Sequence, residues 1–406
     1  MSSAARVAPF LPVSDPLPYG RHAIDDADIA AVVEVLRSDW LAHGPRVGEF
    51  ERAFAVATGA DDAAACSSGT AALHLALAGL DVGEGDLCIV PAMTFLATAT
   101  AARFCGAEVV FADVDPVSGL MTPQTLSAAI AGSPRPPKAV LPVHLGGRIC
   151  AMQEIAAVAR AAGALIVEDA CHALGGADAD GARVGACAWS DAACFSLHPV
   201  KTLAAGEGGM VTLNDPVRAE HLRRLRNHGV TKDTALLTDP LQSCDDEGAI
   251  NPWSYEQIEL GFNYRMNEME AALGLSQLGK LDAFAARRRQ LSAHYDAALH
   301  PLASFVVPVP AGPGTLSPHL YQVAIDFAGA GRSRAEVMRR LGAAGIGSQV
   351  HYLPVYRQPY FRARYGPVSL AGAEAFYASV LALPLFPAMA DGDIARVVEA
   401  LTEALA

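Results

Sequence analysis

Short apolar runs alternate with helical stretches between residues 60 and 215, and this alternation constrains the fold more than any other feature of the chain. Helical patterns fit between the runs, and strands that alternate with helices indicate an α/β fold with a mostly parallel sheet. Ligands bind such sheets beyond the carboxyl ends of the strands. The predicted strands are Ala63–Cys66, Leu87–Val90, Glu108–Ala112, Ala139–Val143, Ala164–Glu168, Ala192–Phe195 and Met210–Leu213, and the helices between them Thr70–Ala78, Leu96–Cys105, Pro123–Ala131 and Met152–Ala162.

The two ends of the chain predict different structures. The first twenty residues are rich in proline and favour an extended arm, which two helices follow at Asp25–Arg37 and Val47–Thr58. A long helical pattern runs from Met266 to Ala298. Shorter elements come after it, at Tyr321–Phe327, Arg334–Ala344 and Gly347–Tyr352, with a last helix from Asp391. We therefore expect an arm (1–24), a large α/β domain (25–285) and a smaller α+β domain (286–406).

Composition argues against several classes of function. The 406 residues carry a net charge of −13 without a block of five Lys or Arg residues, which disfavours nucleic-acid binding. The chain has no uninterrupted run of eighteen apolar residues, so it is not expected to contain a membrane helix. Its N-terminus lacks the pattern of a signal peptide. The eight cysteines are scattered without a C-x-x-C pair. They predict free thiols in a cytoplasmic protein, and no metal site is expected.

Lys201 is one of only four lysines and lies between two predicted strands. It follows Ser196-Leu197-His198-Pro199 and precedes the glycine-rich turn Gly206-Glu207-Gly208-Gly209. The amine of a lysine attacks carbonyl groups when its surroundings lower its pKa. An arginine side chain cannot form the Schiff base that results. The alternative is an ordinary surface lysine in a loop.

Polar residues at the ends of other predicted strands could form a ligand site together with this lysine. Ser68, Gly69 and Thr70 open a helix whose free amides bind phosphate, or serve only as an N-cap. Glu168 and Asp169 end one strand and alternate between its sides, so one carboxylate faces the ligand. There it can keep a heterocyclic nitrogen protonated, although two carboxylates equally suit a metal or a helix cap.

Phe95 and Ser196 are two further candidates for the ligand site. Phe95 can stack on a ring or pack in a core, and Ser196 can bind a phosphate oxygen. With the groups above they supply what pyridoxal phosphate needs: a phosphate cradle, a stacking ring, an acid for the ring nitrogen and an amine for the aldehyde. Neither G-x-G-x-x-G after the first strand nor G-x-x-x-x-G-K-[ST] is present, which argues against dinucleotides and nucleoside triphosphates.

Several motifs together resemble the DegT/DnrJ/StrS family of sugar aminotransferases. They are SSGTAALHLAL, PAMTFLATA, VEDACHALGG, FSLHPVKTLAAGEGG, LRNHGV and LGFNYRMNEMEAALGLSQL. The resemblance runs from about Tyr19 to Pro387. It implies fold type I, pyridoxal 5′-phosphate as cofactor, a homodimer, and a nucleotide-linked keto sugar that accepts an amine from L-glutamate. Members commonly carry threonines where this chain has Leu203-Ala204-Ala205.

The resemblance also assigns roles to residues. Lys201 is implied to be the Schiff-base lysine and Asp169 the partner of the pyridine nitrogen, with His172 and Phe95 against the ring. The phosphate is implied to lie on four residues of this chain and on Asn263 of the partner subunit. The four are Ser68, Gly69, Thr70 and Ser196. Asn263 has an alternative role, as the cap of the helix that starts near Met266.

Three further segments resemble the branch of the family that works in pseudaminic acid synthesis. They are PYGRHAIDDADIAAVV, NPWSYEQIELGFNYR and SQVHYLPVYRQPYF. The implied reaction is amination at C4 of a UDP-linked 4-keto-6-deoxy-N-acetyl sugar. Perosamine-type (GDP-linked) and bacillosamine-type specificities share most of these motifs. Two further classes of protein keep the same fold: a pyridoxamine-dependent sugar dehydratase, which carries His at the Lys201 position, and a non-catalytic regulator.

The candidates for binding the substrate are Arg265, His351 and Tyr352. A chain of net charge −13 that binds a diphosphate must gather cations at the site, because screening removes the effect of charges farther away than roughly 8–10 Å. Arg265 is expected at the cofactor-facing rim, and His351 with Tyr352 at the substrate-facing rim. His351 has a structural role as its alternative.

Overall fold

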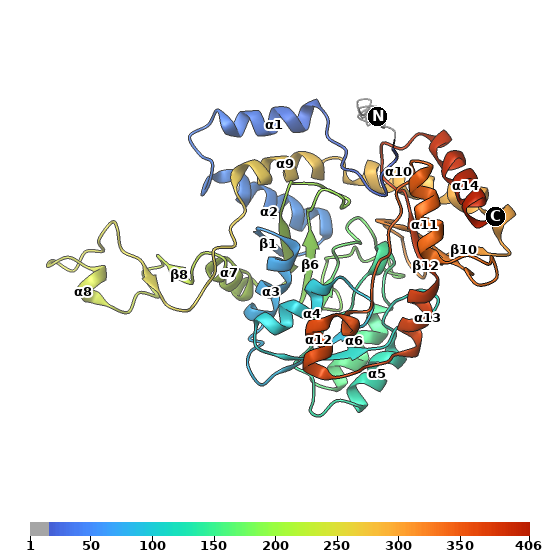
Figure 1. Cartoon of the computed structure of the whole chain (residues 1–406). Coiled ribbons are helices and arrows are strands. Elements are labelled where there is room, and N and C mark those ends of the chain that lie inside the picture. The colour runs from blue at the N-terminus through green and yellow to red at the C-terminus, as the bar shows by residue number, and fades with distance from the viewer. Residues whose placement is uncertain (1–15) are drawn as a thin grey trace.

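The computed structural model describes residues 16–406, so the prediction for the first fifteen residues lies outside the described part. Figure 1 shows the arrangement. The strands are β1 (Asp62–Cys66), β2 (Leu87–Pro91), β3 (Glu108–Ala112), β4 (Ala139–Val140), β5 (Leu165–Asp169), β6 (Ala192–Ser196), β7 (Gly209–Leu213), β8 (Val230–Thr231), β9 (Glu256–Gln257), β10 (Val306–Pro308), β11 (Tyr321–Ile325) and β12 (Val380–Leu383).

The helices surround these strands. They are α1 (Asp26–Leu36), α2 (Pro45–Thr58), α3 (Gly69–Gly79), α4 (Leu96–Phe104), α5 (Pro123–Ala131), α6 (Met152–Ala161), α7 (Pro216–Leu225), α8 (Pro240–Ser243), α9 (Glu268–Leu278), α10 (Leu281–Ala298), α11 (Arg334–Ala343), α12 (Pro359–Tyr365), α13 (Ala371–Ser379) and α14 (Asp391–Leu405). Three short 3-10 helices join them: η1 (Leu145–Gly147), η2 (His300–Leu302) and η3 (Val355–Arg357). Within the described residues no helix is both long and apolar enough to cross a bilayer.

A seven-stranded sheet forms the centre of the molecule, in the order β1-β7-β6-β5-β4-β2-β3. The pairs from β6 to β3 are parallel, and β7 is antiparallel to both its neighbours. The prediction of a mostly parallel α/β sheet is therefore confirmed. Parallel strands place their carboxyl ends at one edge, so the segments after β1, β2, β5 and β6 meet there.

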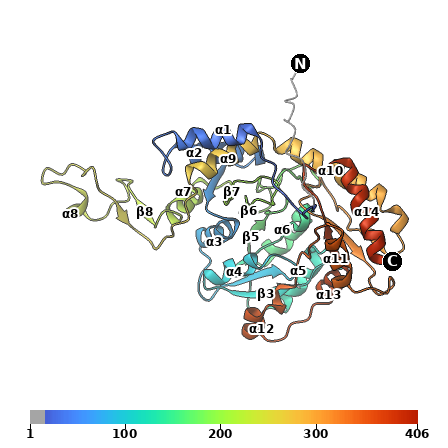
Figure 2. The same cartoon turned by 45° about the horizontal axis from the view of Figure 1, so that its top comes forward.

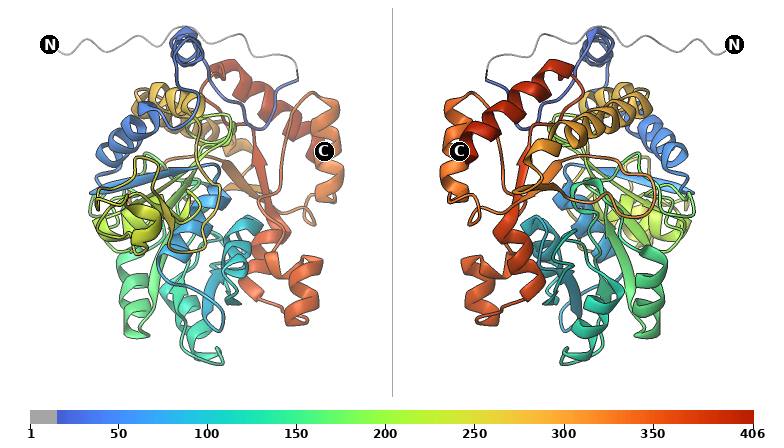
Figure 3. Two further views of the ribbon diagram at one scale, coloured as in Figure 1. Left: turned by 90° about the vertical axis from the view of Figure 1, so that its left-hand side faces the viewer. Right: turned by 90° about the vertical axis from the view of Figure 1, so that its right-hand side faces the viewer.

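Alternate residues of the strands are buried on opposite faces of this sheet. In β1, Ala64 and Cys66 join the larger apolar core, whereas Ala63 and Ala65 join a second core beneath α2 and α9. Helices α3 and α7 pack against the first face. Figure 3 shows helices on both sides of the strands. Burial on both faces explains why the strands are continuous apolar runs in the sequence.

A smaller sheet, β10-β11-β12, packs with α10, α11 and α14 around a core of its own. Helix α10 belongs to both parts, because Leu281 and Phe284 lie in the core beneath α9 while Leu291 and Tyr295 lie in the core of the smaller sheet. The chain from residue 355 to residue 380 then returns to the larger core, where Phe361 and Phe376 are buried.

One segment leaves the body of the molecule. Figures 1 and 2 show residues 230–260, which include β8, α8 and β9, extending away from the sheet. Three apolar side chains on it are largely exposed: Trp253 (73%), Tyr255 (61%) and Leu260 (83%). We call residues 230–260 the projecting segment.

Three predicted elements were wrong in extent or type. The strand expected at Ala139–Val143 ends at Val140, because the chain then bends toward η1. The helical pattern Met266–Ala298 contains two helices, α9 and α10, which break at Gly279 and Lys280. Gly347–Tyr352 is not a strand: only Gln349 forms a bridge, to Ala382, and the strand beside β11 is β12.

Candidate active site

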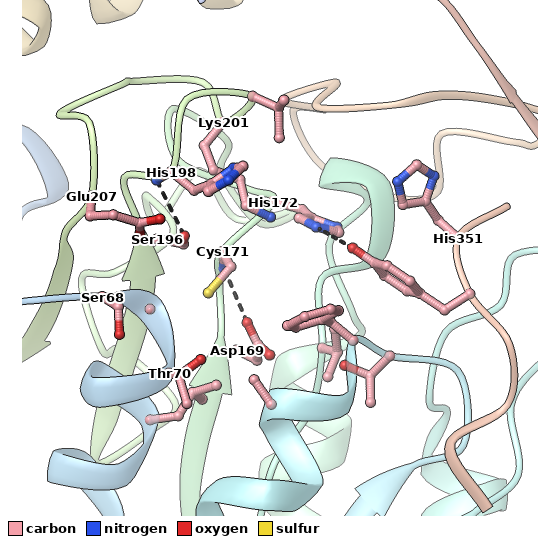
Figure 4. A pocket seen from close by; sticks show the side chains of 18 of the residues that line it. Ser68, Thr70, Asp169, Cys171, His172, Ser196, His198, Lys201, Glu207 and His351 are labelled. Carbon is pink, nitrogen blue, oxygen red and sulfur yellow. Dashed lines mark hydrogen bonds between the residues drawn. The ribbon is translucent and has the colours of Figure 1, made fainter. Parts of the chain in front are cut away.

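A cavity of about 710 Å³ opens where β1, β5 and β6 end and α3 begins. Figure 4 shows most of its side chains. Residues far apart in the sequence converge on this one site, as the rule for parallel sheets predicts. It brings together most of the predicted site residues, namely Ser68, Gly69, Thr70, Phe95, Asp169, His172, Ser196, Lys201, His351 and Tyr352.

Lys201 extends its amine into this cavity. Within residues 16–406 its Nζ atom makes no hydrogen bond and no ion pair, although the backbone amide donates to the His198 carbonyl at 2.8 Å. Burial lowers the pKa of the Lys201 amine below its ordinary value, and Cys171 and Asp169 partly oppose this shift. A lowered pKa gives the amine a larger unprotonated fraction, which is the nucleophilic form.

Asp169 occupies the floor of the cavity with both carboxylate oxygens hydrogen-bonded. The Thr98 hydroxyl donates to Oδ2 at 2.6 Å, and the Cys171 amide donates to Oδ1 at 3.2 Å. Thr94 and Thr98 are 2.7 Å apart, oxygen to oxygen. Since the Thr98 proton is directed at Asp169, Thr94 is the donor of that pair. Bonds of this kind fix a carboxylate in orientation.

Glu168 faces the opposite side of β5, as strand alternation predicts. His144 lies 2.7 Å from one carboxylate oxygen of Glu168, and the Ser190 hydroxyl donates to the other at 2.5 Å. The Cys150 amide donates to His144 Nδ1, so the ring proton lies on Nε2 and points at Glu168. This buried group is separate from the cavity, and only Asp169 of the two carboxylates lines it.

The start of α3 forms the second side of the cavity. The Ser68 side chain caps the helix by accepting from the Ala71 amide, while the Gly69 and Thr70 amides lie in the first turn and have no intrahelical acceptor. A Cβ atom on Gly69 would lie 2.6 Å from Ser196 Cβ. Glycine thus lets Ser196 approach the helix N-terminus, and the amides and hydroxyls together form an anion cradle.

Aromatic rings form the third side. Phe95 is 50% exposed at the cavity rather than packed in a core, and its ring centroid lies 5.8 Å from that of Tyr352. The Gly146 amide donates to His172 Nδ1 at 3.2 Å. Burial lowers the pKa of His172 well below its ordinary value, so the ring is neutral. Its remaining proton, on Nε2, is therefore directed at the Tyr352 hydroxyl, 3.1 Å away.

The Tyr352 hydroxyl consequently keeps its own proton for another acceptor. Burial raises the pKa of this hydroxyl, so the proton stays on it at neutral pH. His351 lies beside it, 5% exposed, and burial lowers the pKa of His351 to about 3. Its Nδ1 atom is buried without a partner in the described part of the chain. This wall thus presents one donor and one neutral imidazole.

Asn263 and Arg265 do not line the cavity of their own chain. Asn263 is exposed and pairs through its backbone with Asn227, and Arg265 Nη1 donates to Asn227 Oδ1 at 2.8 Å. The helix that follows is capped by Asn267, whose side chain accepts from the Glu270 amide. The alternative role of Asn263 as that cap is therefore wrong.

Sequence reasoning missed several residues at the cavity or in contact with Asp169, among them Thr98, Cys171, Tyr19 and Glu207. Thr98 lies within α4 and donates to Asp169, and its spacing of four from Thr94, which precedes the helix, was the local signal of the hydrogen bond between the two hydroxyls. Cys171 follows Asp169 by two positions, so alternation would have placed it. Tyr19 and Glu207 also line the cavity, from the N-terminal arm and the glycine-rich turn. No local pattern marks Tyr19.

The comparisons with known proteins agree with this geometry. Residues 22–402 match the model of the DegT/DnrJ/EryC1/StrS aminotransferase family. The chain belongs to this family. The spore coat polysaccharide biosynthesis protein SpsC of Bacillus subtilis (strain 168) is 37% identical over 390 residues, which are 95% of this chain and 96% of SpsC.

Solved structures of the family superimpose closely. PseC of Helicobacter pylori, an aminotransferase involved in the biosynthesis of pseudoaminic acid, is 25% identical with a TM-score of 0.86, over 97% of this chain and 99% of PseC. The PLP form of Spr1654 from Streptococcus pneumoniae is 27% identical with a TM-score of 0.83, over 96% of this chain and 98% of Spr1654. The family establishes fold type I, a sugar aminotransferase and pyridoxal phosphate as cofactor.

The residues of this DegT/DnrJ/EryC1/StrS member fit that cofactor. The anion cradle suits its phosphate, the fixed carboxylate of Asp169 suits its ring nitrogen, and the unpartnered amine of Lys201 suits its aldehyde. The Phe95 ring supplies an apolar face beside them.

Proposed function

We propose that this enzyme transfers the amino group of L-glutamate to C4 of a UDP-linked 4-keto-6-deoxy-N-acetyl sugar, with Lys201 and Asp169 as its catalytic residues. The observation that carries the proposal is the convergence of an unpartnered lysine amine, a doubly hydrogen-bonded carboxylate and a helix N-terminus in one cavity. The resemblance of three segments to the pseudaminic acid branch supports the choice of acceptor, and the similarity to PseC supports it further.

The protein's part in the reaction follows from the side chains. The cofactor, when bound, supplies an electron sink that stabilises negative charge on the carbon next to the nitrogen. Asp169 holds the positive charge on the ring nitrogen, and Thr98 and the Cys171 amide hold Asp169 in place. The Lys201 amine would hold the cofactor through its aldehyde between turnovers. Once released, this Nζ amine takes up and returns the proton that amine exchange requires.

The remaining cavity residues orient the two ligands. Ser68, Gly69, Thr70 and Ser196 bind the phosphate, and Phe95 and His172 contact the ring. His351 and Tyr352 face the substrate, where the free proton of the Tyr352 hydroxyl can be donated to a sugar oxygen. A neutral His351 at this wall accepts a hydrogen bond without repelling the cationic ring.

The active sites of a homodimer complete this arrangement. Asn263 and Arg265 do not line their own cavity, and they follow directly after the projecting segment, which exposes Trp253, Tyr255 and Leu260. Apolar area of this kind is buried by association. In a second copy, Asn263 reaches the phosphate and Arg265 lies at the rim. The free thiols of all eight cysteines fit work in the cytoplasm.

The acceptor is tested by incubating the holoenzyme with glutamate and a panel of UDP-, GDP- and dTDP-linked 4-keto sugars, with products followed by mass spectrometry. Turnover of the UDP-N-acetyl-4-keto-6-deoxy sugar is the expected result. Preference for a GDP-linked 4-keto-6-deoxy sugar would move the enzyme to the perosamine type and leave the roles of Lys201 and Asp169 intact.

The role of Lys201 is tested separately. Lys201→Ala should lose the visible absorption band of the covalently held cofactor and at least ~10³-fold in turnover, whereas Lys138→Ala should keep both. A band that survives in Lys201→Ala contradicts the assignment. A wild-type protein that shows the band but does not react with glutamate would be a regulator.

The composite site is tested by mixing two inactive variants. Asn263→Ala chains mixed with Lys201→Ala chains should regain activity, because each mixed dimer contains one site with both residues intact. Self-contained subunits would regain none.

A further inference from the structure

A second cavity, of about 170 Å³, lies where the two cores of the molecule meet. Arg148, which follows η1, lies on one side of it, and α10 contributes Ser292 and Asp296. The segments next to β10 and β11 close it with apolar side chains, namely Pro308, Val309, Pro310, Leu316, Pro318 and Leu320. Ala311, and Tyr321 and Gln322 at the start of β11, complete the lining. None of these residues lines the active-site cavity.

Arg148 is buried here without an ion pair to any described residue, although the Asp296 carboxylate, which accepts from the Tyr321 hydroxyl at 2.7 Å, lines the same cavity. Its side chain is part of a residue only 3% exposed, and no carboxylate of residues 16–406 forms an ion pair with it. Nη2 donates to Gln322 Oε1 at 2.7 Å, and Nε has no partner in the described part of the chain. Burial lowers the pKa of the Arg148 guanidinium to about 10, which still leaves it charged at pH 7. An unpaired buried charge is strongly unfavourable, so its retention calls for an anion.

The neighbouring glycine keeps space for the guanidinium. Gly146 has a φ of +69°, and a Cβ atom there would lie 2.9 Å from Arg148 Nη1 and 2.6 Å from Gln322 Oε1. Any other residue would therefore displace both side chains. The turn thus leaves room for a guanidinium at the cavity whose Nε has no partner in the described residues.

We propose that this cavity binds a small organic carboxylate, whose oxygens pair with Arg148 and whose apolar part contacts the proline- and leucine-lined wall. Two parallel N–H donors of a guanidinium match the two oxygens of a carboxylate. The apolar wall favours an anion with a hydrocarbon part over a fully hydrated inorganic ion. The site is distinct from the proposed amine transfer and does not depend on which sugar accepts the amine.

Gln322 connects this site with the active-site wall. Its amide oxygen accepts from Arg148, and its amide nitrogen donates to the His351 carbonyl at 3.1 Å. A carboxylate that draws the guanidinium toward itself competes with Gln322 Oε1 for the same donors. The position of His351 is then expected to respond, and with it the binding of ligands beside Tyr352.

The test uses thermal unfolding of the holoenzyme with butanoate as the probe and butanamide as its uncharged control. Butanoate should raise the Tm in a saturable way, and butanamide should not. Arg148→Met should weaken the apparent affinity for butanoate at least tenfold, whereas Arg339→Met, which removes an exposed charge on α11, should leave it unchanged. Equal responses of the wild type and Arg148→Met would overturn the proposal.

A second variant decides the matter if Arg148→Met fails to fold. Gln322→Glu places a carboxylate of the protein against Arg148, so it should raise the Tm without ligand and abolish the butanoate effect. The apparent KM for glutamate should change at least twofold with butanoate in the wild type and stay constant in Gln322→Glu. A butanoate effect that persists in Gln322→Glu, or a KM that does not respond in the wild type, contradicts the inference.

Discussion

The Thr98 hydroxyl lies 2.6 Å from Asp169 Oδ2 and donates its proton to that carboxylate from the first turns of α4. Thr94 donates to Thr98 in turn, and all three residues are at most 5% exposed. The carboxylate is thus held from a helix that follows a different strand. Its orientation in the cavity depends on this contact as well as on β5.

Replacing this hydroxyl should weaken the cofactor site. Hydrogen bonds to a charged group contribute about 1.5–3 kcal/mol, so Thr98→Val should lower the affinity for pyridoxal phosphate by roughly 10- to 100-fold. The affinity is measured by spectroscopic titration of the apoenzyme. Thr100→Val is the matched control, because the exposed Thr100 hydroxyl donates only to the Leu96 carbonyl. Equal affinities in the two variants would show that the contact is dispensable.

Gly69→Ala should disrupt the phosphate cradle. The added Cβ would lie 2.6 Å from Ser196 Cβ, which forces the start of α3 and the end of β6 apart. We expect at least a tenfold loss of affinity for pyridoxal phosphate and for inorganic phosphate, with the Tm of the apoenzyme lowered by several degrees. Gly83→Ala has open space around its Cβ and should change neither quantity. Unaltered phosphate binding in Gly69→Ala would remove this turn from the cradle.

Acid should destabilise the protein through the buried histidines around the cavity. Burial lowers the pKa of His172 and of His319 well below 6.5, and that of His351 to about 3. Below pH 6.5 these histidines therefore bind protons in the unfolded chain but not in the native state. Each histidine contributes a fall of about 1.4 kcal/mol per pH unit in the free energy of unfolding, until the pH reaches its lowered pKa.

The measurement is urea unfolding of the apoenzyme at several values between about pH 4.5 and pH 7.5. His319→Gln should give a shallower decline than the wild type, because one of the three titrations is removed. His300→Gln, at an exposed position, should follow the wild-type curve. Parallel curves for all three proteins would mean that His319 does not contribute.

The projecting segment should hold two chains together. Trp253→Asp combined with Leu260→Asp places charges on side chains that are 73% and 83% exposed in the single chain, so it should not unfold the subunit. Light scattering should show the wild type as a dimer and the double variant as a monomer with little activity. Val307→Asp, at an exposed apolar position of β10, should remain dimeric. A dimer that tolerates both aspartates would place the interface elsewhere.

Much of the large domain could be predicted because its strands are buried on both faces. Runs such as Leu87–Val90 and Ala192–Phe195 are apolar at every position, and helices of ordinary length separate them. The errors came where local pattern does not decide. The break at Gly279 and Lys280 interrupts a pattern that is helical on both sides, and Val380–Leu383 continues directly from α13 yet pairs with β11.

The site was predictable to the extent that it follows strands. Ser196 ends one, and Asp169 ends another, so topology alone brings them together. Thr98 reaches Asp169 from a helix, Tyr19 reaches the cavity from the N-terminal arm, and Gln322 contacts Arg148 across 174 positions. Such contacts depend on the packing of the complete chain, which periodicity does not contain.

Helix α10 and the returning segment after it have a consequence for biosynthesis. The helix has 18 residues, about 27 Å at 1.5 Å per residue, and its two ends are buried in different cores. The larger core also includes Phe376 and Val380. During translation the part of the protein built on the seven-stranded sheet therefore cannot close when its own strands have left the ribosome. Its core can form only when almost the whole polypeptide has emerged, and until then its apolar surface is accessible to chaperones.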